Sequence, residues 1–371
     1  MVVLFHLDGY IAVKSTFYHF HGHAGPDWSA SVAALGFNGV ELFFAISGFI
    51  LALPFAAHYF NGSPAVGLKK YYLRRVTRLE PPYIFAVLGL FALGVGLQGK
   101  SFTSMGPHLL SSLFYLHNLI YGYGSLVIGV AWSLEVEVQF YLLVPILALI
   151  FKVRNRWLRR SILCAFIISV LVAQQIWMGG SMRARISILA FLQFFLTGFL
   201  LADIFQDEWK SAPGTSLYWD LIALVGWPAL FFVLRSRSLW HWMFPAMILV
   251  LYAAAFRGWL CSRLFSLRWV TVIGGMCYSI YLIHHNIISA VAQFSIRFAE
   301  GLPYWAYLAI QMVIVGTAVL LVCGSYFVLI EKPCMRRDWP HRLRTRCNDW
   351  LAAFETERLS IVSTDNAARE S

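Results

Sequence analysis

The sequence is poor in charge, since Asp, Glu, Lys and Arg make up only 13% of its 371 residues, whereas soluble domains carry about 25%. Hydrophobic residues reach 59% and the mean hydropathy is +0.67. This composition excludes an ordinary soluble domain, and the apolar residues gather in runs about as long as a bilayer is thick. We therefore predict a polytopic protein that has the lipid bilayer as a partner. The net charge of +11 must be assigned loop by loop, and we expect no nucleic-acid partner.

The six cysteines form no C-x-x-C pair and no metal-ligand spacing, which excludes a disulfide framework and gives no reason to expect a bound metal or cofactor. His19, His21 and His23 alternate in a way that can bind Zn²⁺ or Cu²⁺. No further ligand accompanies them, so we expect an ordinary outer loop. The opening MVVLFHLDGYIAV lacks a basic segment and a clear cleavage site, which excludes a signal peptide. We interpret it as the second half of a membrane helix.

The apolar runs also lack the alternation of barrel strands, which favours helices. We predict an all-α, polytopic transmembrane helical bundle of about ten spans, the first of them incomplete at its N-terminal end. The spans are expected near residues 1–13, 36–57, 81–97, 131–151, 161–178, 186–205, 217–234, 239–256, 269–292 and 304–330. They form one transmembrane domain, 1–332, followed by a basic and polar cytoplasmic tail, 333–371. No internal repeat is visible, which argues against an inverted-repeat transporter.

The distribution of Lys and Arg predicts the orientation of this bundle. With the N-terminus in the cytoplasm, twenty of these residues up to Arg346 fall in cytoplasmic segments and seven in outer ones, and Arg358 and Arg369 lie further along the tail. Positive charge collects on the cytoplasmic side of membrane proteins. We therefore expect both termini to be cytoplasmic.

Ionisable residues inside the spans are the candidates for chemistry, because a charge in the bilayer centre costs at least ~2.5–3.5 kcal/mol. They are His6, Glu41, Glu135, Glu137, His284 and His285. Any one of them can be explained by an interhelical hydrogen bond that only stabilises packing. At 1.5 Å per residue, however, His6, Glu41, Glu137 and His284 fall at a similar depth, in the middle or outer part of the membrane. Together they form a candidate acid–base site.

Helical phase separates the two acids of the segment AWSLEVEVQFYLLVP, residues 131–145. Ser133, Glu137 and Tyr141 are spaced i, i+4, i+8 and share one face. Glu135 points about 200° away, nearer the surface, and we expect it to reach solvent. Glu137 is expected to face the histidines and to lie remote from the cytoplasmic arginines.

A second candidate site is the cytoplasmic basic segment LKKYYLRRVTRLEPPY, in which Arg75 and Arg78 are spaced i, i+3 and are expected to project together. Two neighbouring guanidiniums suit a phosphate or pyrophosphate. An ordinary positive-inside loop explains the same charges, and charge alone favours it. The pair Pro81–Pro82 is expected to end this segment and to start the next span.

Six motifs in order resemble those of the acyltransferase-3 family of bacterial integral-membrane O-acyltransferases. They are VVLFH (Val2–His6), GVELFFAISGFI (Gly39–Ile50), LRRVTRLEPPY (Leu73–Tyr83), WSLEVEVQFY (Trp132–Tyr141), YSIYLIHH (Tyr278–His285) and IEKP (Ile330–Pro333). The resemblance implies His6 as catalytic base. It also implies Glu41 followed by Ser47, the paired Arg75 and Arg78, Glu137 rather than Glu135, and His284 as site residues. The family pairs its first histidine with an arginine eleven residues earlier, a position that precedes Met1.

The resemblance further implies transfer of an acyl group, commonly acetyl, from a cytoplasmic donor such as acetyl-CoA. The acceptor would be a hydroxyl of an envelope carbohydrate or lipid-linked molecule at the bacterial inner membrane. Arg75 and Arg78 would hold the donor's phosphates, His6 would deprotonate the hydroxyl, and Glu137 or Glu41 would orient the imidazole. A proton-coupled transporter or flippase of an envelope precursor, using the same acids and histidines as a relay, is the alternative, and a scaffold without catalysis is a third hypothesis.

Overall fold

The computed structural model describes residues 1–18, 27–177, 181–210, 212–235 and 240–336, together with Trp339, Thr345 and Asn348. These residues form helices and no strand. In chain order the helices are α1 (Val2–Lys14), α2 (Trp28–Ala34), α3 (Gly39–Asn61), α4 (Leu68–Gly96), α5 (Phe102–Leu113), α6 (His117–Tyr121), α7 (Trp132–Leu147), α8 (Arg156–Trp177), α9 (Met182–Arg185), α10 (Ile188–Asp207), α11 (Leu217–Arg235), α12 (Trp240–Arg257), α13 (Trp259–Phe265), α14 (Arg268–Gly275), α15 (Cys277–Ser295), α16 (Tyr304–Tyr326) and α17 (Lys332–Cys334). The all-α prediction is confirmed.

Seven helical stretches of the described chain are long and apolar enough to cross a bilayer. They are Trp28–Asn61, Leu68–Gly96, Gly129–Lys152, Arg156–Ile176, Met182–Asp207, Leu217–Leu234 and Tyr304–Cys334. Of the other predicted spans, the first corresponds to α1 with 13 residues, and the eighth to the shorter apolar stretch Trp242–Arg257. The ninth divides at Met276 into α14 and α15. The chain is a polytopic helical bundle, and the number of ten spans stays a prediction.

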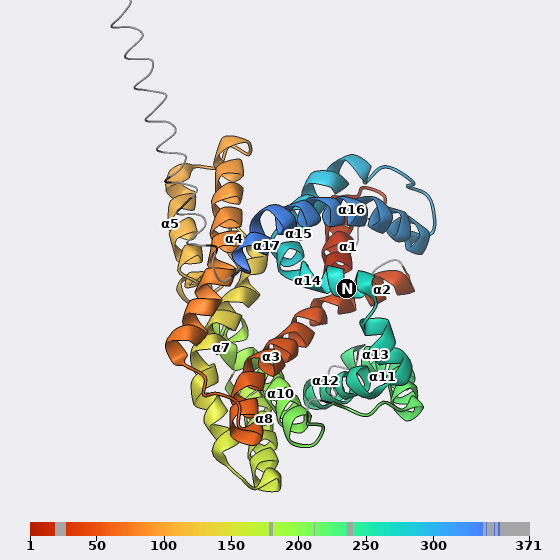
Figure 1. Ribbon diagram of the computed structural model, residues 1–371. Helices are drawn as coiled ribbons and strands as arrows, with labels where there is room; N and C mark the ends of the chain where they lie inside the picture. Colours follow the sequence, from red (N-terminus) through yellow and green to blue (C-terminus); the bar gives the residue numbers. More distant parts are fainter. Residues whose placement is uncertain are drawn as a thin grey trace, which may run out of the picture.

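Figure 1 shows the helices of the bundle, and three apolar clusters hold them together. The largest joins α3, α7, α8, α10 and α12. A second joins α1, α2, α15 and α16, and a third packs α4 and α5 against α7 and α15. Helix α7 therefore belongs to the first and third clusters, and α15 to the second and third. Five of the six motifs lie on α1, α3, α4, α7 and α15, which the clusters bring together. The sixth, IEKP, follows α16 in a π-helical turn and α17.

The tightest contact in the bundle is the crossing of α3 and α10 at two glycines. A methyl group on Gly48 would overlap the backbone carbonyl of Phe195, and one on Gly198 would overlap that of Ala45. No real side chain tolerates such an overlap, so the two backbones touch only because both positions are glycine. Small residues at a helix crossing are the usual device for close packing in membranes.

A buried ion-pair network ties α8 to the end of α10. Arg159 and Arg160, which the sequence places among the ordinary cytoplasmic charges, both bind the carboxylate of Asp203, and the Arg160 Nε–Oδ1 distance is 2.7 Å. Asp203 is fully buried, and Asp207 joins the network at 3.2 Å from Arg159. Such a pair is costly to break, because either partner alone would leave a buried charge uncompensated.

Helix α4 continues without interruption through Pro81 and Pro82, so the prediction that these prolines end one segment and start the next is wrong. Pro81 has no N–H to donate to the carbonyl of Thr77, one turn earlier. The indole Nε1–H of Trp339 donates to that oxygen instead, at 2.9 Å. A partner from a distant part of the chain thus replaces the missing bond and helps the helix to continue.

We predict that Gly198→Ala destabilises the protein by at least about 1–3 kcal/mol, the usual cost of overpacking, because the new methyl group would overlap the backbone of α3. The thermal unfolding midpoint in detergent, followed by size-exclusion chromatography, measures this. Gly89→Ala in α4 is the matched control, since a methyl group there meets no atom within 4 Å. Equal midpoints for the two variants would show that α3 and α10 do not depend on this contact.

Candidate active site

Three imidazole rings from two helices form what we call the histidine cluster. The ring centroid of His6 on α1 lies 5.1 Å from that of His284 and 5.1 Å from that of His285, both on α15. Apolar packing between α1 and α15 holds the rings together, with Leu7 and Ile288 among the buried contacts. His284 is 1% exposed, whereas His285 is exposed. The structure thus brings together two of the four residues of the predicted acid–base site.

The hydrogen bonds of His284 define the state of its ring. Its Nδ1 lies 2.7 Å from the carbonyl oxygen of Ile280 and 3.0 Å from that of Tyr281. Both oxygens are acceptors only, so Nδ1 carries a proton, and in the neutral ring Nε2 is left with a lone pair. This Nε2 is buried and has no hydrogen-bond partner among the described residues. An unpaired buried acceptor is costly, which marks this atom as a candidate for a functional hydrogen bond.

Helix α15 is anchored on the helix that carries two of the glutamates. The hydroxyl of Tyr281 donates to the carbonyl of Val130 at 2.6 Å and accepts from the N–H of Leu134 at 3.1 Å. The hydroxyl of Ser133 lies 3.1 Å from the same oxygen. Ser133, predicted as a supporting residue, therefore contacts Tyr281, whose own carbonyl binds His284. Its role is to position the histidine helix.

The start of α15 is held by a carboxylate from the end of α16. Glu331, in a π-helical turn (Phe327–Glu331) that ends α16, accepts from the N–H of Ser279 at 3.0 Å and from its hydroxyl at 2.5 Å. An acid is favourable at a helix N-terminus, where backbone N–H groups lack partners. The IEKP and YSIYLIHH motifs thus meet, and together they fix where α15 begins.

Glu137 contacts α3 and, through Tyr141, the basic segment of α4. The hydroxyl of Ser47 donates to its Oε1 at 2.6 Å, and the Tyr141 hydroxyl also hydrogen-bonds to this carboxylate. The guanidinium of Arg75 lies over the ring of Tyr141, 5.7 Å from its centroid, and 5.6 Å from that of Tyr71. The expectation that Glu137 is remote from the arginines is therefore wrong. Ser47, Glu137 and Tyr141 form one connected group that ends at Arg75.

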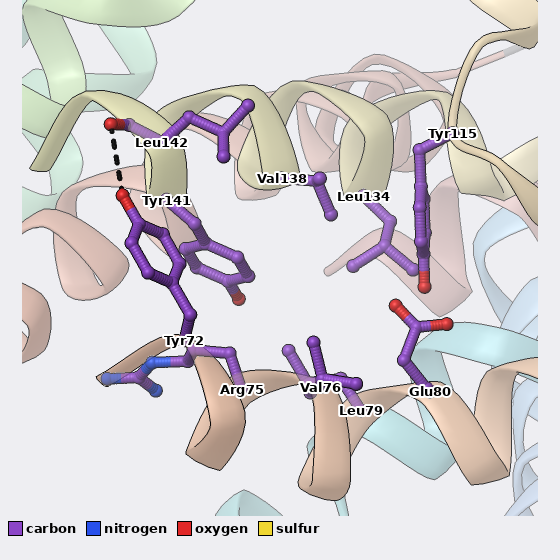
Figure 2. A pocket seen from close by; sticks show the side chains of 10 residues that line it. All are labelled: Tyr72, Arg75, Val76, Leu79, Glu80, Tyr115, Leu134, Val138, Tyr141 and Leu142. Atoms are coloured by element: carbon purple, nitrogen blue, oxygen red, sulfur yellow. Dashed lines mark hydrogen bonds between the residues drawn. The ribbon is translucent and has the colours of Figure 1, made fainter. Parts of the chain in front are cut away.

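A small groove lies between α4 and α7 (Figure 2), with a volume of about 120 Å³. Arg75 and Tyr141 lie toward one end, and Glu80 points toward Tyr115 at the other. Apolar side chains of α4 and α7, such as Val138, form the walls between them. The groove is therefore a narrow apolar passage with a cation at one end.

The two predicted arginines lie in different surroundings. Arg75 is half-buried and faces α7, while Arg78 is exposed and acts electrostatically on Glu331. Both arginines lie on α4, as expected, but their side chains face different neighbours instead of projecting together. The structure places Arg75, and not Arg78, at the groove.

Glu41 is buried at the start of α3. It is 2% exposed, contacts the side chain of Asn38, and has an Oε2 with no partner among the described residues. The start of α3 packs against α1, since a methyl group on Gly39 would touch Val2 at 2.8 Å. The described contact of the Glu41 carboxylate itself is with its own helix start.

The prediction that Glu135 reaches solvent is wrong, because this side chain is fully buried. Its Oε2 accepts the N–H of Asn118 at 2.8 Å, and the N–H of His117 also binds this carboxylate. Glu135 thus caps the short helix α6, which is part of the segment 98–131 that folds back over the start of α7. Helical phase predicted its direction on α7, but it did not show that a loop covers that face.

Asp8 is a buried acid that the sequence analysis did not single out. It lies two residues after His6, and its Oδ1 accepts from the hydroxyl of Tyr304 on α16 at 2.6 Å. The sequence could have indicated Asp8 as a candidate, because it is an acidic residue inside an apolar run.

A pair of histidines in the segment between α4 and α7 also escaped the sequence analysis. His108 and His117 approach to 2.9 Å between Nδ1 and Nε2, in a segment with no pattern that would predict it. In the part of the chain that the structure describes, no group of three or more His, Cys, Asp or Glu side chains suits a metal. The alternating histidines His19, His21 and His23 lie outside the described residues.

Comparison with known proteins identifies the class. The family model of the acyltransferase domain, the acyltransferase-3 family, matches residues 1–328. The chain therefore belongs to this family, as the motifs predict. No solved structure matches it.

Individual relatives point in the same direction. The O-acetyltransferase OatA of Staphylococcus aureus strain NCTC 8325 is 23% identical over 342 residues, which cover 85% of this chain and 55% of OatA. SACOL0978 of strain COL, whose name assigns it provisionally to the O-acetyltransferases, is 24% identical over 313 residues, 77% of this chain and 50% of its own. The chain thus spans about half the length of the curated relatives it matches.

The pair of His108 and His117 predicts a pH dependence of stability. Burial lowers the pKa of His117 below its usual 6.5, and the neighbouring His108 lowers this pKa further. Below about pH 6.5 the unfolded chain binds a proton that the folded chain does not, so this contribution to stability is lost as the pH falls. The unfolding midpoint of the wild type should therefore approach that of His117→Gln between about pH 7 and 5. A difference that stays constant over this range would contradict the assignment.

Proposed function

We propose that this protein is an O-acetyltransferase that moves an acetyl group from a cytoplasmic acetyl-CoA-type donor to a hydroxyl of an envelope carbohydrate or lipid-linked acceptor. Membership of the family and the names of the relatives support acetyl transfer in general. The observation that carries the proposal is the histidine cluster, where His6 lies beside the buried lone pair of His284. Such an arrangement suits the removal of a proton from a hydroxyl.

The donor end is assigned to the groove between α4 and α7. A thioester donor of this class combines a phosphate-bearing head with a thin, extended arm. Arg75 at the entrance supplies a cation for phosphate, and the apolar walls suit the arm. Arg78, exposed on the same helix, adds a second cation near the surface. Both arginines belong to the segment that the positive-inside rule assigns to the cytoplasm, which is the side of the proposed donor.

Glu137 is assigned to the donor end because its contacts lead to Arg75. Its carboxylate, held by Ser47, anchors the hydroxyl of Tyr141, and the ring of Tyr141 supports the guanidinium. The acid would thus fix the wall of the groove, a role different from orienting His6. In the transfer itself, the acceptor oxygen loses its proton to His6 and attacks the thioester carbon. The carbon–sulfur bond breaks and the thiolate leaves.

We expect the enzyme to lie in the bacterial inner membrane with both termini in the cytoplasm. In this orientation the arginines lie on the donor side and the histidines in the middle or outer half. A transporter or flippase would need no acyl donor, so acceptor-dependent release of free CoA from purified protein separates the two functions. Activity of this kind would exclude the transporter and the scaffold without catalysis.

His6→Ala should lower the rate of acetyl transfer by about 10²–10⁴-fold, the usual contribution of general base catalysis. Incorporation of base-labile label from radiolabelled acetyl-CoA into the envelope carbohydrate of membranes measures this. The amount and unfolding midpoint of the protein should stay unchanged. Normal turnover of this variant would remove His6 from the mechanism.

Glu137→Gln and Glu135→Gln are a matched pair that separates the two acids. The first should abolish transfer with little effect on folding, because it disturbs the groove wall. The second should lower stability by about 0.5–2 kcal/mol, the range for a helix cap, and leave the turnover of the folded fraction close to normal. Size-exclusion chromatography and CoA release, measured on the same samples, distinguish these outcomes; the reverse pattern would assign catalysis to Glu135.

Arg75→Ala should raise the KM for acetyl-CoA about tenfold or more, since a charge-assisted hydrogen bond contributes about 1.5–3 kcal/mol. Arg78→Ala should have a smaller effect, and the double variant the largest. Arg74→Ala is the control, because Arg74 is an exposed cation on the same helix that does not line the groove. An unchanged donor dependence in the double variant would exclude a phosphate role for this pair.

A further inference from the structure

The histidine cluster contains an acceptor whose donor is not yet accounted for. The surroundings of His284 determine the tautomer of its neutral ring, since Nδ1–H donates to the carbonyls of Ile280 and Tyr281. The remaining lone pair, on Nε2, is buried and unpaired among the described residues. A buried imidazole in this state can only accept at Nε2.

The neighbouring side chains leave few donors for this lone pair. The hydroxyl of Tyr281 donates to the carbonyl of Val130 and is therefore occupied. The third ring of the cluster, His285, contacts His6 edge to face and is exposed. The amino group of Met1 acts electrostatically on His284, but it is not a side chain of the cluster. Among the side chains His6 remains: its ring is in contact with that of His284, tilted by 53° at 5.1 Å between centroids, and a neutral imidazole carries one N–H.

We propose that His284 is a positioning residue that fixes the tautomer of His6. The two rings are in contact but not hydrogen-bonded in the structure. In the reacting complex one ring nitrogen of His6 turns to donate its N–H to Nε2 of His284, and the other nitrogen is left with the lone pair that takes the proton of the acceptor hydroxyl. This inference rests on the proposed acetyl transfer and deepens it, because it names the group that orients the base. In a serine hydrolase a carboxylate has this role; here a neutral imidazole has it.

The proton balance follows from this arrangement. The acceptor O–H bond breaks as the free nitrogen of His6 takes the proton, and the oxygen forms its bond to the acyl carbon. The resulting imidazolium keeps its other N–H on Nε2 of His284, which stabilises the charge without adding a second one. The thioester sulfur leaves as a thiolate and takes a proton from cytoplasmic water, and His6 returns its proton to solvent before the next turnover.

The glutamates expected from the sequence to orient the base are less suited to this role. Glu137 is engaged with Ser47 and Tyr141, and Glu41 contacts Asn38. Neither carboxylate has a described contact with the histidine cluster.

The rings in contact with His6 are those of Phe5, His284 and His285. Phe5 has no polar atom in its side chain, and His285 lacks the pair of backbone carbonyls that fixes the ring of its neighbour. The group that orients the base is therefore His284 rather than a carboxylate.

The test compares His284→Phe, His284→Gln and His285→Phe in the full chain, purified in detergent. CoA release from acetyl-CoA with solubilised envelope glycan gives kcat and KM for the donor. His284→Phe should lower kcat at least about tenfold with the KM for acetyl-CoA unchanged, because the base loses its orientation and the donor groove is untouched. His284→Gln should recover much of this loss, since its amide oxygen can accept at the position of Nε2. His285→Phe, which removes the third ring of the cluster, should lower kcat less than His284→Phe does, because His285 lacks the backbone carbonyls that fix the ring of His284.

The outcomes separate this inference from the proposed function. A wild-type protein that releases no CoA, while OatA of Staphylococcus aureus does so under the same conditions, would overturn the acetyl transfer itself. With an active wild type, normal kcat in His284→Phe would overturn the role of His284. Equal losses in His284→Phe and His284→Gln, with a lower unfolding midpoint in both, would show that the residue only packs α15. A loss confined to His285→Phe would move the orienting role to the exposed ring.

Discussion

The contact between the backbones of α3 and α10 at Gly48 and Gly198 constrains much of the site. It fixes the position of α3 so closely that Ser47, next to Gly48, reaches Glu137 on α7 at 2.6 Å. Helix α10 is in turn tied to α8 by the buried ion pairs of Asp203. The hydroxyl of Ser47 that donates to Glu137 is thus positioned by the backbone contact of α3 with α10. It does not depend on the conformation of a long, flexible side chain.

Helix α7 connects the histidine cluster with the groove beside Arg75 along its length. Its first turn binds the hydroxyl of Tyr281 and so holds α15 with the histidine cluster. One turn later Glu137 meets α3, and another turn later Tyr141 lies under Arg75 of α4. Ser133, Glu137 and Tyr141, spaced i, i+4, i+8 in the sequence, therefore contact three different helices. Their partners are α15, α3 and α4, in that order.

The features that depend on a single helix could be predicted from the sequence, and those that depend on a distant partner could not. Helical phase put the two glutamates of α7 on opposite faces, because 3.6 residues per turn holds in any helix. It failed to bury Glu135, since the helix that this acid caps comes from a segment with no membrane pattern. Depth along the spans placed His6 level with His284, and their rings do meet. Pro81 was expected to break α4, but the indole of Trp339 donates to the carbonyl that the proline leaves free. The two groups of this bond are 262 residues apart in the chain, a separation over which no local pattern can predict a contact.

A neutral partner for His6 also fits the medium in which the site lies. A carboxylate held in the bilayer interior costs at least ~2.5–3.5 kcal/mol, and it would be paired with a cation only while His6 carries a proton. A neutral imidazole whose Nδ1–H is satisfied by the carbonyls of Ile280 and Tyr281 carries no charge between turnovers. It offers a single lone pair when the imidazolium forms. In the proposed mechanism the fixed tautomer of His284 therefore orients the base without placing a permanent charge inside the membrane.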